Sequence, residues 1–475
     1  MAAPGIVART RNAFKAFARG YAGYDVTGGS GKWPAQYALT APISQQLMAT
    51  RLASRKISWL VENSALVASI VQNAVTAIVG DGPTVRSAHP DPAVNTYLQN
   101  AWNAFYARCD IEGTQSLGGY LSRVARGFQI DGESFTQLVV DPVTMRLALR
   151  LLTADQVDSS KTLPSLGMTG DAPMIVAGVE FDDIGRRVAF WIFRTPLDAP
   201  WASISPAVRV DALDVCHVFE PRFPGVPRGM SPLTAIAGLA QELDQCHDAA
   251  VVKLKTTALV AMIVRDTDGS NVAIDATTDP ASLHLEPGAT LRLPPGTDVT
   301  FPPTAEMSSI GEVLKHFARL CCAGAGVPYF MAANDYGEVN YSAGKLGLAT
   351  YLRRIKSVQQ NHIVAQLLNP IWDRFVLLEI LSGRMRAADY ESHPEFYAAN
   401  FLFPGWPALD ELKKAKADTL AVAARLRSRQ EIIAEGGRDA ADVDAEIEAD
   451  PFTADNLSAS AGNIAAQPDQ ESTNA

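Results

Sequence analysis

Long apolar runs and a regular cysteine spacing are both missing from this 475-residue sequence. The longest apolar stretch, residues 65–79, is interrupted by Gln72 and Asn73, so it falls short of the roughly 20 residues that a membrane-spanning helix needs. The five cysteines are odd in number and two are adjacent, which argues against a disulfide framework and for reduced thiols. The basic N-terminus lacks the apolar core of a secretory signal. We therefore expect no membrane partner.

Nucleotide and dinucleotide motifs are missing as well. Gly31-Lys32 is followed by Trp33 where a P-loop needs Ser or Thr, so the hydroxyl that binds Mg²⁺ is lacking. Gly324-Ala325-Gly326 has Tyr329 in place of the third glycine of a dinucleotide fingerprint. The sequence therefore predicts no cofactor and favours a non-enzymatic protein.

Metal and nucleophile patterns are weak. Cys216-His217 and Cys246-His247 are adjacent pairs, whose side chains diverge on a strand or a helix, so neither is a natural chelate. Cys321 and Cys322 follow His316 by five and six residues on an apolar helix, which is more typical of core packing than of a nucleophile. A thiol-dependent hydrolase using Cys321 or Cys322 stays open as an alternative.

Positive charge is scarce overall, with 41 Lys and Arg against 51 Asp and Glu and a net charge of −10. A protein that grips nucleic acid by neutralising phosphates is usually basic, so this balance argues against tight DNA binding. The signs are separated along the chain. Residues 1–56 hold eight basic residues and one acid, whereas residues 431–475 hold eleven acids and one Arg. Oppositely charged ends favour contacts between copies of the chain, or between the chain and different partners.

Helical and strand periods alternate along the sequence and predict an α+β fold. The helical pattern covers, approximately, 45–79, 92–110, 116–131, 231–264, 308–325, 342–369, 370–385, 409–426 and 428–436. Strands rich in Val, Ile, Phe and Trp are predicted near 134–141, 146–152, 176–182, 187–194, 208–220, 290–293 and 298–301. Ser231-Pro232 has the cap and first-turn proline of the longest helix.

Six blocks of the sequence are distinctive when taken in order. They are Arg51–Arg55 through Gly80-Asp81-Gly82-Pro83, Asp131-Gly132-Glu133-Ser134-Phe135, Arg222–Leu233 with its Arg228-Gly229-Met230-Ser231, Gly326-Val327-Pro328-Tyr329 with Asn340-Tyr341-Ser342, Ala408–Ala415, and Ser428–Asp439. In this order the blocks resemble the portal protein of lambda-type tailed phages. Asp131 and Ala343 depart from the family pattern, as does Leu409-Asp410, where Asp-Pro is usual.

The resemblance implies a portal fold assembled as a ring of about twelve subunits. Its parts would follow one another as a flexible basic arm (1–45), an α/β wing (46–230), a first stem helix (231–264), a β-rich clip (265–304), a second stem helix (305–326), a tunnel loop (327–341), a tunnel-side helix with more of the wing (342–404), a helical crown (405–449) and a disordered tail (450–475). Some portals of this family are trimmed after assembly, and the Gly-rich arm would be open to a protease.

The resemblance also implies a role and partners. The ring would sit at one capsid vertex of the virion, after assembly in the bacterial cytoplasm, and double-stranded DNA would be packaged and ejected through it. Expected partners are the terminase large subunit, a head–tail connector or adaptor protein, and the major capsid and scaffold proteins. A capsid adaptor that never forms a ring is a second alternative.

Candidate functional residues follow from that architecture, because charged side chains that face a channel can repel or retard a phosphate backbone. In the stem they are Glu242, Asp244, Asp248, Lys253 and Lys255. In the tunnel loop and its helix they are Asp335, Asn340, Tyr341, Ser342 and Lys345, with Ser342 also expected as the helix N-cap. For the contact between subunits they are Arg353, Arg354 and Lys356.

Overall fold

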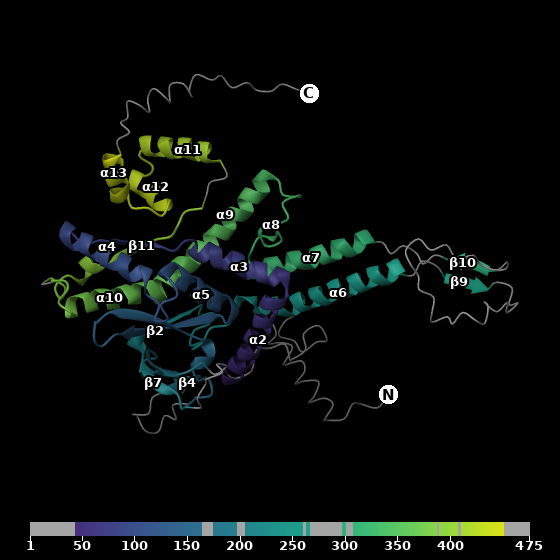
Figure 1. Ribbon diagram of the computed structural model, residues 1–475, viewed down its shortest axis with the longest axis horizontal. Coiled ribbons are helices and arrows are strands. Elements are labelled where there is room, and N and C mark those ends of the chain that lie inside the picture. The colour runs from purple at the N-terminus through teal and green to yellow at the C-terminus, as the bar shows by residue number, and fades with distance from the viewer. Residues whose placement is uncertain are drawn as a thin grey trace, which may run out of the picture. The chain divides into compact units, whose positions relative to one another are not determined.

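The computed structural model describes residues 43–163, 174–196, 205–259, 263–266, 297–300, 307–386, 389–406 and 410–450 (Figure 1). Residues 1–49 and 50–475 are separate units, and the contacts discussed below lie within the second. The expected basic arm, apart from its last three residues, most of the expected clip, and the expected tail after residue 450 lie outside the described residues. Within the described helices, none is both long and apolar enough to cross a membrane.

The main hydrophobic core is built by helices from distant parts of the chain. It contains α3 (Ala65–Val79), α4 (Pro92–Ala107), α5 (Leu117–Ile130) and α10 (Asn369–Leu381). Trp102 of α4 and Trp372 of α10 are both about 1% exposed, and their ring centroids are 5.0 Å apart. Burial of such large aromatic surfaces stabilises the packing of these helices.

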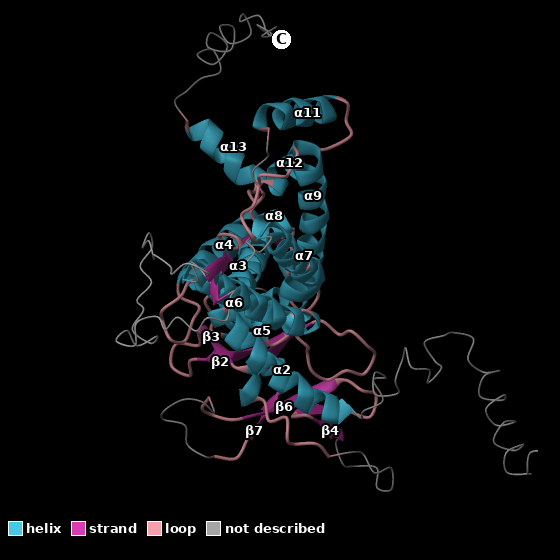
Figure 2. Ribbon diagram, turned by 90° about the vertical axis from the view of Figure 1, so that its right-hand side faces the viewer, coloured by secondary structure: helices cyan, strands magenta, loops and turns pink. Residues whose placement is uncertain are grey.

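Two antiparallel sheets form the β part of the predicted wing (Figure 2). The first has the order β3-β2-β8, and the second has the order β4-β5-β6-β7. Phe135 of β2 and Phe190 of β6 are buried with an edge-to-face contact, so the two sheets share a second apolar core. The strands are β2 (Glu133–Val140), β3 (Leu147–Leu152), β4 (Met174–Val176), β5 (Val179–Phe181), β6 (Arg187–Ile192), β7 (Val208–Asp211) and β8 (Val215–Phe219).

Three predicted elements are divided in the structure. The helix expected over 45–79 is two helices, α2 (Ile43–Asn63) and α3, which are separated at Ser64. The strand expected over 208–220 is β7 and β8, which belong to different sheets and are joined by the 3₁₀ turn Ala212–Asp214. The strand expected over 176–182 is the hairpin β4–β5, because Ala177 and Gly178 both take positive φ and turn the chain.

The predicted first stem helix is shorter than expected. Ser231 caps a 3₁₀ turn, Pro232–Ala235, and the α-helix itself is α6 (Ala237–Leu259). Residues 263–266, at the predicted helix end and clip start, form strand β9 (Ile263–Asp266), which pairs with β10 (Thr297–Thr300). The predicted second stem helix is α7 (Met307–Ala325), and it packs alongside α6 (Figure 1).

One continuous helical run replaces the two helices expected over 342–369 and 370–385. It consists of α9 (Tyr341–Val358), a π-helical segment (Gln359–Leu368) and α10. Pro370 lacks an N–H and its ring crowds the carbonyl four residues earlier, which normally breaks a helix. The wider π turns lie directly before this proline, so the run continues through it.

The expected crown contains α11 (Glu411–Ala423), α12 (Arg429–Glu435) and a further helix, α13 (Ala440–Ala449). A two-stranded antiparallel sheet was not predicted. It joins β1 (Thr84–Ser87) to β11 (Ala399–Leu402). Short helical elements complete the chain: Ala154–Gln156, α8 (Tyr329–Ala332) and Pro394–Tyr397.

Candidate functional site

A buried ion pair links strand β2 of the wing to the loop that leads into α6. Arg228 and Glu133 are 3% and 5% exposed. The Arg228 Nε and Nη2 atoms donate to Glu133 Oε1 at 2.8 and 2.6 Å, and Nε also donates to Oε2 at 3.0 Å. The same guanidinium donates to the carbonyl oxygens of Ala154 and Ala177 at 2.8 and 3.0 Å. Planar, bidentate pairing of this kind fixes orientation as well as charge.

Close backbone contact explains why glycine occupies positions 132 and 229, in two of the blocks that resemble the portal family. Gly132 has φ of +80°, and a Cβ there would lie 2.0 Å from the Met230 carbonyl carbon. A Cβ on Gly229 would lie 2.1 Å from the Gly132 carbonyl oxygen. Ser231 Oγ donates to the Gln129 carbonyl at 2.8 Å and also caps the turn that leads into α6. The blocks Asp131–Glu133 and Arg228–Ser231 therefore form one packing joint.

The charged groups at this joint shift one another's pKa values. Burial by itself would raise the pKa of Glu133, but Arg228 and His217 hold it at about 2. Burial lowers the pKa of His217 to about 4, although its 3.0 Å contact with Glu133 opposes the shift. Burial, with repulsion from Glu133, raises the pKa of Asp131 to about 7. Glu133 and His217 are enclosed, so their geometry suits holding β2 and β8 in place.

The predicted stem residues are mostly exposed along α6. Glu242, Asp248, Lys253 and Lys255 all lie on the surface of the described chain. Asp244 is half-buried, and its Oδ1 accepts a hydrogen bond from Ser64 Oγ at 3.2 Å. Ser64 is the N-cap position of α3, where a carboxylate complements the helix dipole. The structure thus gives Asp244 an intramolecular role in addition to its predicted channel role.

The predicted tunnel loop is held to α7 by ion pairs that sequence reasoning missed. Lys315 Nζ lies 3.1 Å from Asp335 Oδ2 and 2.9 Å from Glu338 Oε1. Arg319 Nη2 lies 2.8 Å from Glu338 Oε2. Only Asp335 of these four was predicted. The i, i+4 spacing of Lys315 and Arg319 places both on one helix face, which is the pattern that could have identified them.

The start of α9 corrects one prediction. Asn340 is the N-cap, because its Oδ1 accepts from the Ala343 N–H at 2.8 Å. Ser342 lies in the first turn and is not the cap. Tyr341 is 58% exposed, and Lys345 is also exposed, so both side chains are free to meet a ligand.

The three predicted interface residues lie near the end of α9, and all three are exposed. Arg354 Nη1 donates to the Ala325 carbonyl at 3.1 Å and so ties α9 to the end of α7 within one chain. Among the described residues, the side chains of Arg353 and Lys356 make no hydrogen bond or ion pair. Their role between subunits stays a prediction.

The thiol alternative fits poorly with the described geometry. Cys321 and Cys322 are 0% and 1% exposed. Burial raises the pKa of both thiols, that of Cys322 to about 12. A nucleophilic cysteine needs an accessible thiolate, and these side chains are packed in the core. In the part of the chain that the structure describes, no group of three or more His, Cys, Asp or Glu residues could hold a metal ion.

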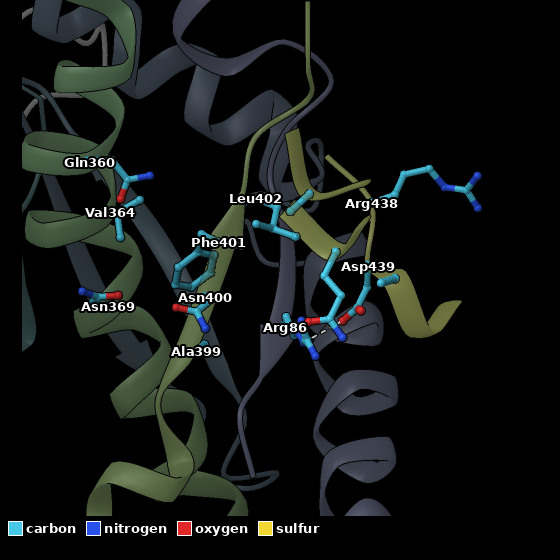
Figure 3. A pocket seen from close by; sticks show the side chains of 13 residues that line it. Arg86, Gln360, Val364, Asn369, Ala399, Asn400, Phe401, Leu402, Arg438 and Asp439 are labelled. Atoms are coloured by element: carbon cyan, nitrogen blue, oxygen red, sulfur yellow. Dashed lines mark ion pairs between the residues drawn. The ribbon is translucent and has the colours of Figure 1, made fainter. Parts of the chain in front are cut away.

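A polar cavity of about 400 Å³ lies beside β11 (Figure 3). The π-helical segment contributes Gln360 and Val364 to its wall, and the crown contributes Arg438 and Asp439. Arg86 of β1 pairs with Asp439 at 3.0 Å across this region. A Cβ on Gly437 would lie 2.9 Å from Pro404 Cα, so the crown also contacts the body by close backbone approach. The cavity marks the joint between crown and body.

Solved structures that match this chain include chains of gene transfer agent particles and a phage portal protein. One chain from the neck of a native gene transfer agent particle, computed with C12 symmetry, has a TM-score of 0.46 and 14% identity over 82% of this chain and 92% of that chain. A chain from the virion of the native gene transfer agent particle has a TM-score of 0.43 and 15% identity over 83% and 93%. An HK97 family phage portal protein from Corynebacterium diphtheriae has a TM-score of 0.34 and 12% identity over 67% and 94%.

The assignment to a family rests on sequence. The family model described as "Phage portal protein, lambda family" matches residues 34–359, which is more than half of the chain. The match covers the joint of Glu133 and Arg228, both helices α6 and α7, and the loop that leads into α9. This chain therefore belongs to the lambda family of phage portal proteins.

Proposed function

We propose that copies of this chain form a closed ring of about twelve subunits, through which double-stranded DNA enters and leaves a phage head. Membership of the lambda family of phage portal proteins supports this role. The ring would occupy one capsid vertex of the virion, contact major capsid and scaffold proteins, and dock first the terminase large subunit and later a head–tail adaptor.

Exposed apolar side chains on paired helices carry the ring proposal. Val251 and Leu254 of α6 are 40% and 44% exposed, and Val313 and Leu320 of α7 are 52% and 44% exposed. Apolar residues in such number on one helical pair favour burial against another protein surface. A head-to-tail contact between identical copies would cover them and, when the rotation closes, generates a ring.

The charges on the same elements support a conduit. Acidic Glu242 and Asp248 on α6 would repel phosphates, so DNA would slide without being gripped. Lys253, Lys255 and Lys345 would supply weak, screened attractions along the path. The acidic net charge of −10 agrees with a channel that conducts DNA rather than a clamp that holds it.

Substitution of the exposed residues at the start of α9 tests the path of the DNA. Tyr341→Ala and Lys345→Ala should leave the fold and oligomer intact, because both side chains are exposed, and should reduce packaged DNA severalfold. A packaging assay with purified components measures the protected DNA. Lys56→Ala, which changes an exposed lysine on α2, serves as the matched control. Full packaging by both variants would contradict a DNA path that passes Tyr341 and Lys345.

A further inference from the structure

Four charged side chains hold the loop of residues 333–340 against α7. Lys315 and Arg319 are 28% and 50% exposed, and the loop carboxylates Asp335 and Glu338 are 35% and 66% exposed. Lys315 contacts both carboxylates, and Arg319 contacts Glu338. Two cations on a helix are therefore neutralised by two acids of the same chain.

An aromatic ring lies beside the two cations. The Lys315 ammonium is 6.0 Å and the Arg319 guanidinium carbon 5.5 Å from the centroid of the Tyr329 ring. Tyr329 Oη donates to Asp335 Oδ2 at 3.5 Å. Both basic groups therefore lie within the range of cation–π attraction to one ring, which favours their staying close together. The pair is thus organised for binding an anion.

The carboxylates of Asp335 and Glu338 compete with any external anion for Lys315 and Arg319, and such an anion can displace them. Ion pairs at exposed positions contribute little net stability, because water and salt screen them. Neither loop carboxylate is enclosed, and the loop also exposes Tyr336 at 61%. A duplex presents a dense row of phosphates and releases counterions when lysine or arginine binds it. Phosphates can therefore take over the cations from Asp335 and Glu338.

We propose that Lys315 and Arg319 form a binding site for the DNA phosphate backbone, which Asp335 and Glu338 occupy when DNA is absent. The proposal rests on the proposed function only in placing DNA next to α7. Phosphate binding releases loop 333–340 from α7, and departure of the DNA allows the loop to return.

Removal of the competing acids tests this site. The double variant Asp335→Asn/Glu338→Gln keeps the size of both side chains and frees the cations. Binding of a random 60-base-pair duplex to the full chain is measured by fluorescence anisotropy across a salt series. We expect at least severalfold tighter binding at low salt, and a log–log salt slope that is steeper by about 0.9 for each added phosphate contact.

The control changes net charge by the same amount elsewhere. Asp444→Asn/Glu446→Gln removes two exposed α13 carboxylates that pair with Arg429 and Arg438. Adding Lys315→Gln and Arg319→Gln to the loop variant should abolish its gain. Equal affinities for the loop variant and the α13 control would overturn the site.

A second readout follows the loop directly. Backbone amides of residues 333–340 should exchange hydrogen faster when duplex is added to the unaltered chain, and unchanged exchange would also contradict the proposal. Images of the same samples show whether rings form, so the proposed function is tested separately from the phosphate site. A chain that does not form a ring contradicts the conduit, whereas the affinity order of the variants still decides the phosphate site.

Discussion

At the residue scale, the buried pair of Glu133 and Arg228 decides how the wing meets α6. Arg228→Ala would leave the Glu133 carboxylate buried without its partner, so the free energy of unfolding should fall by about 3–5 kcal/mol. Denaturant unfolding of the purified chain measures this loss. Arg186→Ala removes a 76% exposed arginine that pairs with Asp182 at 3.4 Å, and should cost less than about 1 kcal/mol. Equal losses in both variants would refute the role of the pair.

Asp131 interacts electrostatically with the same pair, and its shifted pKa makes the stability of the fold depend on pH. Its pKa is raised from 3.8 to about 7, so the folded chain binds a proton more tightly than the unfolded chain. Its contribution therefore becomes more destabilising as pH rises from about 4 to 7. Asp131→Asn should have little effect near pH 4 and should stabilise the chain by about 1–3 kcal/mol at pH 8. Thermal unfolding at several pH values measures this, and a gain that is independent of pH would disagree.

Sequence reasoning recognised both blocks of this joint but not their contact. Gly132 and Gly229 are visible as turn residues, and Ser231-Pro232 as a helix start. Glu133 and Arg228 are 95 positions apart in the sequence, and no local pattern links them. Their pairing depends on how the loop after β8 returns to the start of β2, where Glu133 lies opposite Phe219.

At the element scale, the spacing of apolar residues predicted most of the helices and strands. Contacts between residues far apart in the sequence determine where those elements end. The sequence around Ser64 contains neither Gly nor Pro, so its helical pattern predicts one continuous helix. Ser64 instead bonds to Asp244, 180 positions later, and the chain turns there. The sheet of β1 and β11 was missed for the same reason, because its partners are about 300 residues apart.

Helix α11 has no buried residue, so its apolar side chains are available to a neighbour. Leu412 and Leu420 are 66% and 69% exposed. Leu412→Lys/Leu420→Lys should leave the unfolding temperature of the dissociated chain unchanged, because neither side chain packs in the core. If the ring covers them, the subunit dissociation constant should rise at least about tenfold. Sedimentation velocity over a dilution series measures this.

The matched control for α11 places lysines on two wing turns. Val143 and Ile184 are 89% and 69% exposed, and Val143→Lys/Ile184→Lys introduces the same charge. Assembly of this control should match that of the unaltered chain. Equal weakening in both double variants would mean that charge alone, and not the α11 surface, governs assembly.

At the scale of the whole molecule, the separation of charge is as informative as its sum. The eleven acids after residue 430 account for much of the negative balance, while the first 56 residues are basic. The sequence shows this polarity directly, but it does not predict which faces of α6, α7 and α9 meet a neighbour. Those faces depend on the relation between subunits, which one chain does not contain.

Direct imaging of the purified full-length protein tests the central claim. Negative-stain class averages should show closed rings of about twelve subunits with a central opening wide enough for double-stranded DNA. Monomers, open filaments, or closed discs without an opening would contradict a ring that conducts DNA.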